Sequence, residues 1–194
     1  MSEQYEAVIL AGGRSRRMGR DKALLPFGGY STLAEFQYRR LLGIFPRVSI
    51  SAKTDKFPFE APLIPDESAV SSPMVALAAV LRRIECDGVF LLGVDMPFVS
   101  KTSIERLLAI AEEKPDTPIV SLRSDRGIEP LCAIYRRALL PRIELLISRD
   151  IHRLRTLHEE NSAIYLSVEN RGELANLNRP EEYEKAIKAL RVES

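Results

Sequence analysis

Short apolar runs alternate with amphipathic stretches along the chain, and this alternation predicts strands and helices in turn. The continuous apolar run Val89–Val94 is typical of a strand buried on both faces, as in the middle of a parallel sheet. Met74, Leu77, Ala78 and Leu81 follow the spacing of one helix face. The order of the elements predicts an α/β fold in which helices cover a mostly parallel sheet. The other expected strands are Ala7–Leu10, Val48–Ala52, Leu63–Ile64, Thr117–Ser121, Leu131–Tyr135 and Ile164–Val168, and the other expected helices are Thr32–Leu42, Thr102–Ala111, Pro141–Arg155 with a break near Asp150, and Asn178–Leu190.

Three helix starts carry sequence signals of their own. Ser72 before Pro73 is a typical cap followed by a proline in the first turn. The segment Thr102-Ser103-Ile104-Glu105 has the spacing of a capping box. Asn178 is suited to cap the last helix.

Composition indicates an ordinary folded protein. The chain has 194 residues, 45% of them hydrophobic and 28% charged, and no linker divides it, so we expect a single domain over residues 1–194. A net charge of +1 argues against nucleic acid or a membrane as partner, and no apolar run approaches the roughly 20 residues that span a bilayer. The first residues lack the basic segment of a signal peptide, and Cys86 and Cys132 carry no pairing pattern. We therefore expect a cytoplasmic location and reduced thiols.

The most informative segment is the loop that follows the first expected strand. Gly12 and Gly13 lack a Cβ, so the backbone can turn or approach a ligand closely, and amide groups in such a turn bind anions. The segment fits neither the Walker loop nor the G-x-G-x-x-G fingerprint. Its positive charge points to a ligand that carries phosphates, and the cations that supply it are Arg14, Arg16, Arg17, Arg20 and Lys22.

From Leu10 to Lys22 the chain resembles, without a gap, the L-A-G-G-x-S-x-R-M-G-x-D-K signature of the MobA family of molybdenum cofactor guanylyltransferases. The resemblance implies a Rossmann-like three-layer nucleotidyltransferase fold. It also implies catalytic roles for Lys22 and Arg17. Nucleotide contacts are expected from Leu10, Ala11, Gly12, Gly13 and Lys22.

Asp95 ends the buried run Val89–Val94, where an isolated charge needs a partner. Spacing alone leaves two roles open: the cap of a tight turn beside Pro97, or a ligand of Mg²⁺, which takes carboxylate and phosphate oxygens together. Asp95-Met96-Pro97 also resembles the Asp-x-Pro of the same family, where the aspartate binds the metal. The resemblance favours the metal role, and it adds Asp95 to the catalytic and nucleotide-binding residues.

Other positions correspond to family contacts. Ser51 and Asp66 match nucleotide contacts after the second and third strands, although the family often has Asn at the position of Ser51. Asn176 and Asn178 match the family's Asn-x-Asn pair, which lies on the acceptor or metal side. Because ligands of parallel sheets bind beyond the carboxyl ends of the strands, we expect the glycine loop, Asp66 with Ser68, and Asp95 to meet at one edge.

The resemblance implies transfer of GMP from GTP to a molybdopterin-type acceptor with Mg²⁺ as cofactor and release of pyrophosphate. Molybdoenzymes or their chaperones are the implied recipients of the product. Two alternatives stay open: a sibling nucleotidyltransferase that uses CTP or another phosphorylated acceptor, and a non-catalytic GTP-binding module. Ala11-Gly12-Gly13 favours the guanylyl branch, since cytidylyl relatives more often have Ala-Ala-Gly.

Overall fold

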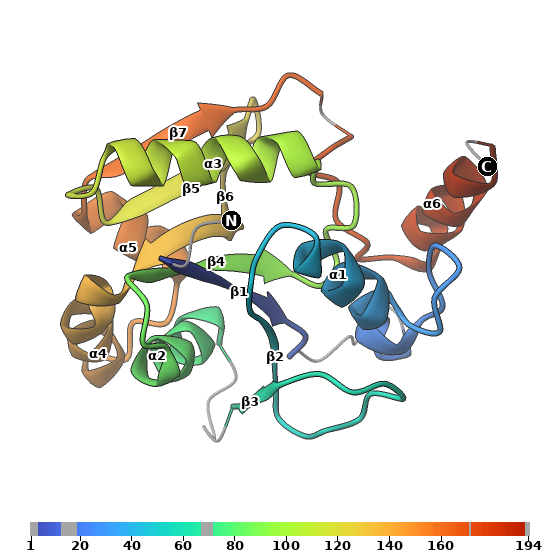
Figure 1. Cartoon of the computed structure of the whole chain (residues 1–194), viewed down its shortest axis with the longest axis horizontal. Coiled ribbons are helices and arrows are strands. Elements are labelled where there is room, and N and C mark those ends of the chain that lie inside the picture. The colour runs from blue at the N-terminus through green and yellow to red at the C-terminus, as the bar shows by residue number, and fades with distance from the viewer. Residues whose placement is uncertain (1–3, 13–18, 67–71, 171, 193–194) are drawn as a thin grey trace.

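The computed structural model describes residues 4–12, 19–66, 72–170 and 172–192. In these ranges seven strands form one sheet, in the order β3-β2-β1-β4-β6-β5-β7, with helices on both faces (Figure 1). The expected three-layer α/β arrangement is therefore confirmed. The strands are β1 (Tyr5–Leu10), β2 (Val48–Ala52), β3 (Leu63–Pro65), β4 (Gly88–Gly93), β5 (Ile119–Ser124), β6 (Gly127–Arg136) and β7 (Ala163–Ser167).

The sheet is mostly parallel, as predicted. β1 runs parallel to both β2 and β4. β2 also runs parallel to β3, and β5 runs parallel to β7. β6 runs antiparallel to both of its neighbours, β4 and β5. It begins at Gly127, four residues before the expected start at Leu131, because β5 and β6 form a hairpin that extends beyond their apolar parts.

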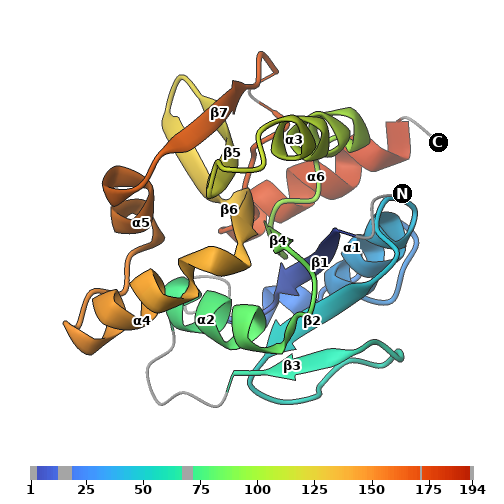
Figure 2. The ribbon, with the colours of Figure 1, turned by 60° about the vertical axis from the view of Figure 1, so that its left-hand side comes forward.

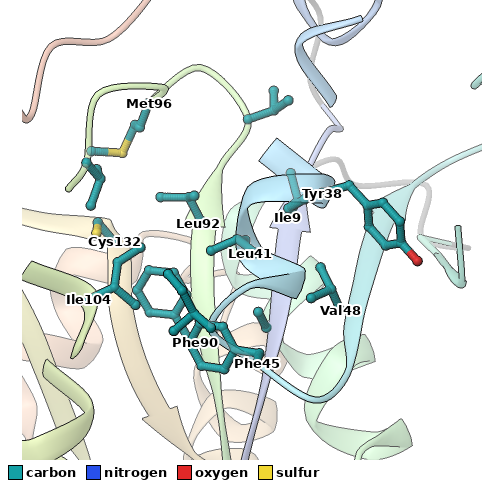
Figure 3. Packing of buried hydrophobic residues seen from close by; sticks show 14 of the residues in the cluster. Ile9, Tyr38, Leu41, Phe45, Val48, Phe90, Leu92, Met96, Ile104 and Cys132 are labelled. Atoms are coloured by element: carbon teal, nitrogen blue, oxygen red, sulfur yellow. The ribbon is translucent and has the colours of Figure 1, made fainter. Parts of the chain in front are cut away.

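The two faces of the sheet bury different residues because side chains alternate along a strand. On β1, Ile9 belongs to the cluster beneath α1, α3 and α6, whereas Val8 belongs to the cluster beneath α2, α4 and α5 (Figure 2). Within the first cluster the rings of Phe45 and Phe90 stack at 5.3 Å (Figure 3). The helices are η1 (Lys22–Leu24), α1 (Leu33–Leu42), α2 (Pro73–Arg83), α3 (Lys101–Glu113), η2 (Arg137–Leu139), α4 (Leu140–Ser148), α5 (Leu154–Glu160) and α6 (Pro180–Val192).

The predicted cap of α2 is confirmed, since the hydroxyl of Ser72 accepts the N–H of Val75 at 3.2 Å. The predicted capping box at Thr102 is wrong. α3 starts earlier, at Lys101, and Ser100 caps it by accepting the N–H of Ser103 at 3.0 Å.

A long-range contact explains this earlier start. The carboxylate of Glu173, far along the chain, accepts both the N–H and the hydroxyl of Ser100 and so holds the cap in place. The interruption predicted near Asp150 is also present. The segment expected as one helix forms α4 and α5, and Asp150 between them has a left-handed backbone with φ of 61°.

Among the helices described, none combines the length and apolar character that crossing a bilayer requires. Both cysteines are free thiols; Cys132 is buried and Cys86 is half-buried.

Candidate active site

The carboxyl ends of β1, β2, β3 and β4 meet at one edge of the sheet. The N–H of Val94 donates to the carbonyl of Leu10 at 3.1 Å, and the N–H of Ala11 donates to the carbonyl of Ser51 at 2.9 Å. The N–H of Asp66 donates to the carbonyl of Ala52 at 3.0 Å. The described parts of the segments expected to meet, which are the end of β1, Asp66 and the start of the Asp95 loop, therefore lie at one edge, as predicted.

Gly12 lies exposed at the end of β1, and a Cβ placed on it would meet no atom within 4 Å. Its φ is not in the left-handed region, so the glycine leaves space at the strand end rather than making a strained turn possible. Gly13, Arg14, Arg16 and Arg17 lie outside the described residues, as does Ser68.

Lys22 is positioned by its sequence neighbour Asp21. One oxygen of Asp21 accepts the N–H of Ala23 at 3.0 Å and so caps the short helix η1, whose first residue is Lys22. The other oxygen pairs with the ammonium of Lys56, which also donates to the carbonyl of Ala11 at 3.2 Å. Lys56 thus ties η1 to the end of β1. Sequence reasoning did not single out Lys56, because its partners are distant in the chain.

The ammonium of Lys22 connects three segments. Its Nζ lies 2.7 Å from Oδ2 of Asp95 and 2.8 Å from Oδ1 of Asn178. The side chains of Lys22 and Asp95 are 16% and 18% exposed, so the pair is only partly screened by water. Asn178 was also expected to cap α6. That helix begins at Pro180, and the carboxylate of Glu182 accepts the N–H groups of Asn178 and Arg179 instead.

The loop that carries Asp95 is held from α1. The guanidinium of Arg40 donates to the carbonyls of Pro97 and Val99, at 2.9 and 2.6 Å, and Gln37 donates to the carbonyl of Val94 at 3.4 Å. Burial lowers the pKa of Arg40 to about 10. A partly buried cation in this place fixes the course of the Asp95 loop by hydrogen bonds to its backbone.

Beyond Asp95, a pocket of about 950 Å³ lies between the β5–β6 hairpin, the segment before α6, and α6 itself. Asn176, Asn178 and Glu129 line it. Burial raises the pKa of the Glu129 carboxyl, opposed by a hydrogen bond from the N–H of Leu131 at 3.4 Å; the charge of Asp95 raises it further, and a hydrogen bond from the Asn176 side chain lowers it. The sequence alone assigned no chemical role to Glu129.

Ser51 and Asp66, expected to contact the nucleotide, lie at the other end of this edge. Ser51 is 2% exposed within β2, and Asp66 is 7% exposed just after β3. Leu10 and Ala11 are also buried, whereas Gly12, which follows them, is exposed. These nucleotide contacts stay predictions.

The donor set around Lys22 fits a hard divalent cation. An oxygen of Asp95 and an oxygen of Asn178 already converge on one positive centre, the ammonium, and carboxylate and amide oxygens are ligands that Mg²⁺ accepts. The described part of the chain contains no group of three or more His, Cys, Asp or Glu side chains able to hold a metal ion. A cation bound by Asp95 would therefore take most of its ligands from phosphates and water.

The described strands thus form a mostly parallel sheet covered on both faces, and Lys22 and Asp95 pair at its carboxyl edge. A family model described as MobA-like NTP transferase domain matches residues 7–164. The chain belongs to this family.

Relatives match over nearly the whole length. A protein of Campylobacter jejuni subsp. doylei named molybdenum cofactor guanylyltransferase is 34% identical, over 94% of this chain and 95% of the relative. A protein of the same name from Helicobacter pylori strain P12 is 30% identical, over 97% and 94%. The crystal structure of molybdopterin-guanine dinucleotide biosynthesis protein A from Archaeoglobus fulgidus has a TM-score of 0.81 at 22% identity and covers 96% of this chain and 99% of its own. That structure has the same fold.

Proposed function

We propose that the protein is a guanylyltransferase that moves GMP from GTP to the phosphate of a molybdopterin-type acceptor, forming the guanine dinucleotide cofactor and releasing pyrophosphate. The observation that carries the proposal is the position of the Lys22 ammonium between Asp95 and Asn178. Strand ends with an exposed glycine lie on one side of it, and the large pocket lies on the other. Such an arrangement suits a reaction between two phosphate-bearing substrates. The names of the relatives support GTP and molybdopterin as those substrates.

In the proposed reaction an oxygen of the acceptor phosphate attacks the α-phosphorus of GTP. The bond from that phosphorus to the bridging oxygen of the β-phosphate breaks, and pyrophosphate leaves with the electron pair. Lys22 stabilises the negative charge that develops on the phosphate oxygens. The acceptor phosphate is already an anion, so the step needs no covalent enzyme intermediate, and the residues act by positioning and electrostatics.

Mg²⁺ is the proposed cofactor, held by Asp95 with Asn178 beside it. When bound, Mg²⁺ would neutralise phosphate charge and orient the phosphates for displacement. Asp95 would then exchange its ammonium partner for the metal, which leaves Lys22 available to phosphate oxygens. Oxygen donors of this kind suit Mg²⁺ better than soft metals.

The remaining residues divide between the two substrates in this proposal. Arg17 adds positive charge to the triphosphate, and Asn176 and Asn178 face the acceptor from the pocket. The whole chain acts as one nucleotidyltransferase domain in the cytoplasm and passes its product to molybdoenzymes or their chaperones. The residues proposed for the nucleotide are Leu10, Ala11, Gly12, Gly13, Lys22, Ser51, Asp66 and Asp95.

The test uses the purified full-length chain with a molybdopterin acceptor, Mg²⁺ and each of the four nucleoside triphosphates in turn. Release of pyrophosphate and formation of the dinucleotide with GTP alone is the expected result. Turnover with CTP alone would assign the chain to the cytidylyl branch. Tight GTP binding without pyrophosphate would indicate a non-catalytic binding module.

A further inference from the structure

Glu129 lies on the opposite side of Asp95 from the strand ends proposed for the nucleotide. In the sheet order, β1, β2 and β3 lie to one side of β4, and β6, which carries Glu129, lies to the other. Asp95 follows β4, between the two halves. A group on β6 is therefore placed to contact the acceptor rather than the nucleotide.

An irregularity in the sheet gives Glu129 its position. Ser121 and Leu122 are neighbours on β5, yet they pair with Ala133 and Glu129 of β6. Pro130, Leu131 and Cys132, which lie between these two residues of β6, are left out of the pairing with β5. Bulges of this kind re-aim side chains next to active sites. The hydroxyl of Ser121 donates to the carbonyl of Glu129 at 3.1 Å and secures the distorted strand.

Other carboxylates also line the pocket, but two of them already accept hydrogen bonds from backbone N–H groups. Glu173 accepts from Ser100, and Glu182 accepts the N–H groups that precede α6. Glu129 is contacted by the Asn176 side chain and by the N–H of Leu131, the latter in a long hydrogen bond of 3.4 Å. A carboxylate has about four acceptor positions. Glu129 can therefore accept further hydrogen bonds from a ligand in the pocket.

A carboxylate beside an acceptor that carries a phosphate is repulsive unless the acceptor also donates hydrogen bonds to it. A pterin offers a matching pair of donors, the ring N–H and the adjacent exocyclic amino group of its aminopyrimidinone ring. Two parallel N–H···O bonds to one carboxylate are geometrically specific and stronger than neutral hydrogen bonds. The charge and the shape of the two groups are thus complementary.

We propose that Glu129, supported by Asn176, binds the donor edge of the acceptor's aminopyrimidinone ring and so determines which acceptor the enzyme accepts. This inference rests on the proposed function. Guanine carries the same donor edge, but the proposed nucleotide residues Ser51 and Asp66 lie on the other half of the sheet. The ring that donates these hydrogen bonds to Glu129 is therefore the pterin of the acceptor and not the guanine of GTP.

The test compares the wild type with Glu129→Gln, in which an amide N–H₂ replaces one acceptor oxygen. We expect KM for the molybdopterin acceptor to rise by roughly 10- to 100-fold, while kcat and the Kd for GTP stay within about threefold. Binding of free pterin and of lumazine, which has a carbonyl in place of the amino group, is followed by their fluorescence. The wild type should prefer pterin by at least about tenfold, and Glu129→Gln should lose this preference.

Glu105→Gln is the matched control, because it makes the same chemical change on α3 at a carboxylate that is 53% exposed and lies outside the pocket. It should behave as the wild type in every assay. An unchanged acceptor KM, or an unchanged preference for pterin in Glu129→Gln, would overturn the inference while leaving guanylyl transfer intact. A changed preference for GTP over ITP would also overturn it, because Glu129 would then contact the nucleotide base. Failure of the proposed function would show separately, as a lack of GTP-dependent pyrophosphate release in the wild type.

Discussion

Lys22 and Asp95 are 73 positions apart in the chain, yet the ammonium of one lies 2.7 Å from the carboxylate of the other. Lys22 opens a short helix after β1, and Asp95 follows β4, which pairs with β1 along its whole length. The parallel register therefore carries both charges to the same place. Charges that are already positioned need little reorganisation when a phosphate group reacts beside them.

Lys22→Met removes the ammonium and keeps a side chain of similar length. We expect turnover to fall by roughly 10²–10³-fold, as for the loss of one preorganised group that stabilises charge in the transition state. Steady-state pyrophosphate release measures the effect, and a thermal melt checks that the fold is kept. Lys101→Met is the control, because Lys101 is 63% exposed on α3 and pairs only loosely with Glu105. Equal losses in both variants would contradict a specific role for Lys22.

A double-mutant cycle tests whether Lys22 and Asp95 act together. Asp95→Asn alone should lower turnover on the order of 10²–10³-fold and raise the Mg²⁺ concentration needed for half-maximal rate. Residues that serve one step are not additive, so the double variant should be no more than about tenfold slower than the slower single variant. Multiplying losses would mean that the two side chains act in separate steps, in spite of their contact.

Much of this edge could be predicted because its signals are local. The apolar run Val89–Val94 predicted a buried strand, and all six residues of β4 are buried. The rule that ligands bind beyond the carboxyl ends of parallel strands then placed Lys22, Asp66 and Asp95 on one edge. The burial of a strand and the place where it ends follow from residues that are close together in the chain. They could therefore be predicted from the sequence.

The supports of the site were not predictable, because their partners are remote in the chain. Arg40 contacts carbonyl groups 57 and 59 positions away, and Lys56 contacts a carbonyl 45 positions away. Every residue has a backbone carbonyl, so no sequence motif predicts which carbonyl accepts such a hydrogen bond. The cap of α3 shows the same limit: Thr102 had the better local pattern, but Glu173 secures Ser100 from a distant loop.

Arg40→Met tests whether the Asp95 loop depends on this partly buried cation. The carbonyls of Pro97 and Val99 would lose their donor, so the free energy of unfolding should fall by about 2–3 kcal/mol. Urea unfolding at pH 7 measures it. Arg39→Met is the control: Arg39 is 48% exposed, its contact with Glu35 spans 3.7 Å, and a change below about 0.5 kcal/mol is expected. If Arg40→Met left stability unchanged, the loop would owe its course to packing alone.

Stability should also depend on pH through His158. This imidazole is 4% exposed; its Nε2 lies 2.7 Å from the hydroxyl of Tyr135, and the ring stacks on Tyr165. Burial, together with the positive charge of Arg155, lowers the pKa of His158 to about 4. Above about pH 6.5 the imidazole is neutral whether the chain is folded or not. As the pH falls from there toward 4, the unfolded chain binds a proton that the folded chain excludes, so folding stability is lost over this range.

The slope of the free energy of unfolding should reach at most about 1.4 kcal/mol per pH unit from this group. Urea titrations at half-unit steps between pH 4 and 8 measure it, and His158→Gln should flatten the curve between pH 4 and 6.5 because the amide does not titrate there. The chain has two histidines, so His152→Gln, at a position 22% exposed beside Asp150, is the matched control and should retain the slope. If the slope survived in His158→Gln and disappeared in His152→Gln, His152 would be the titrating group and the prediction would be wrong. If the slope survived in both variants, carboxylates would account for it.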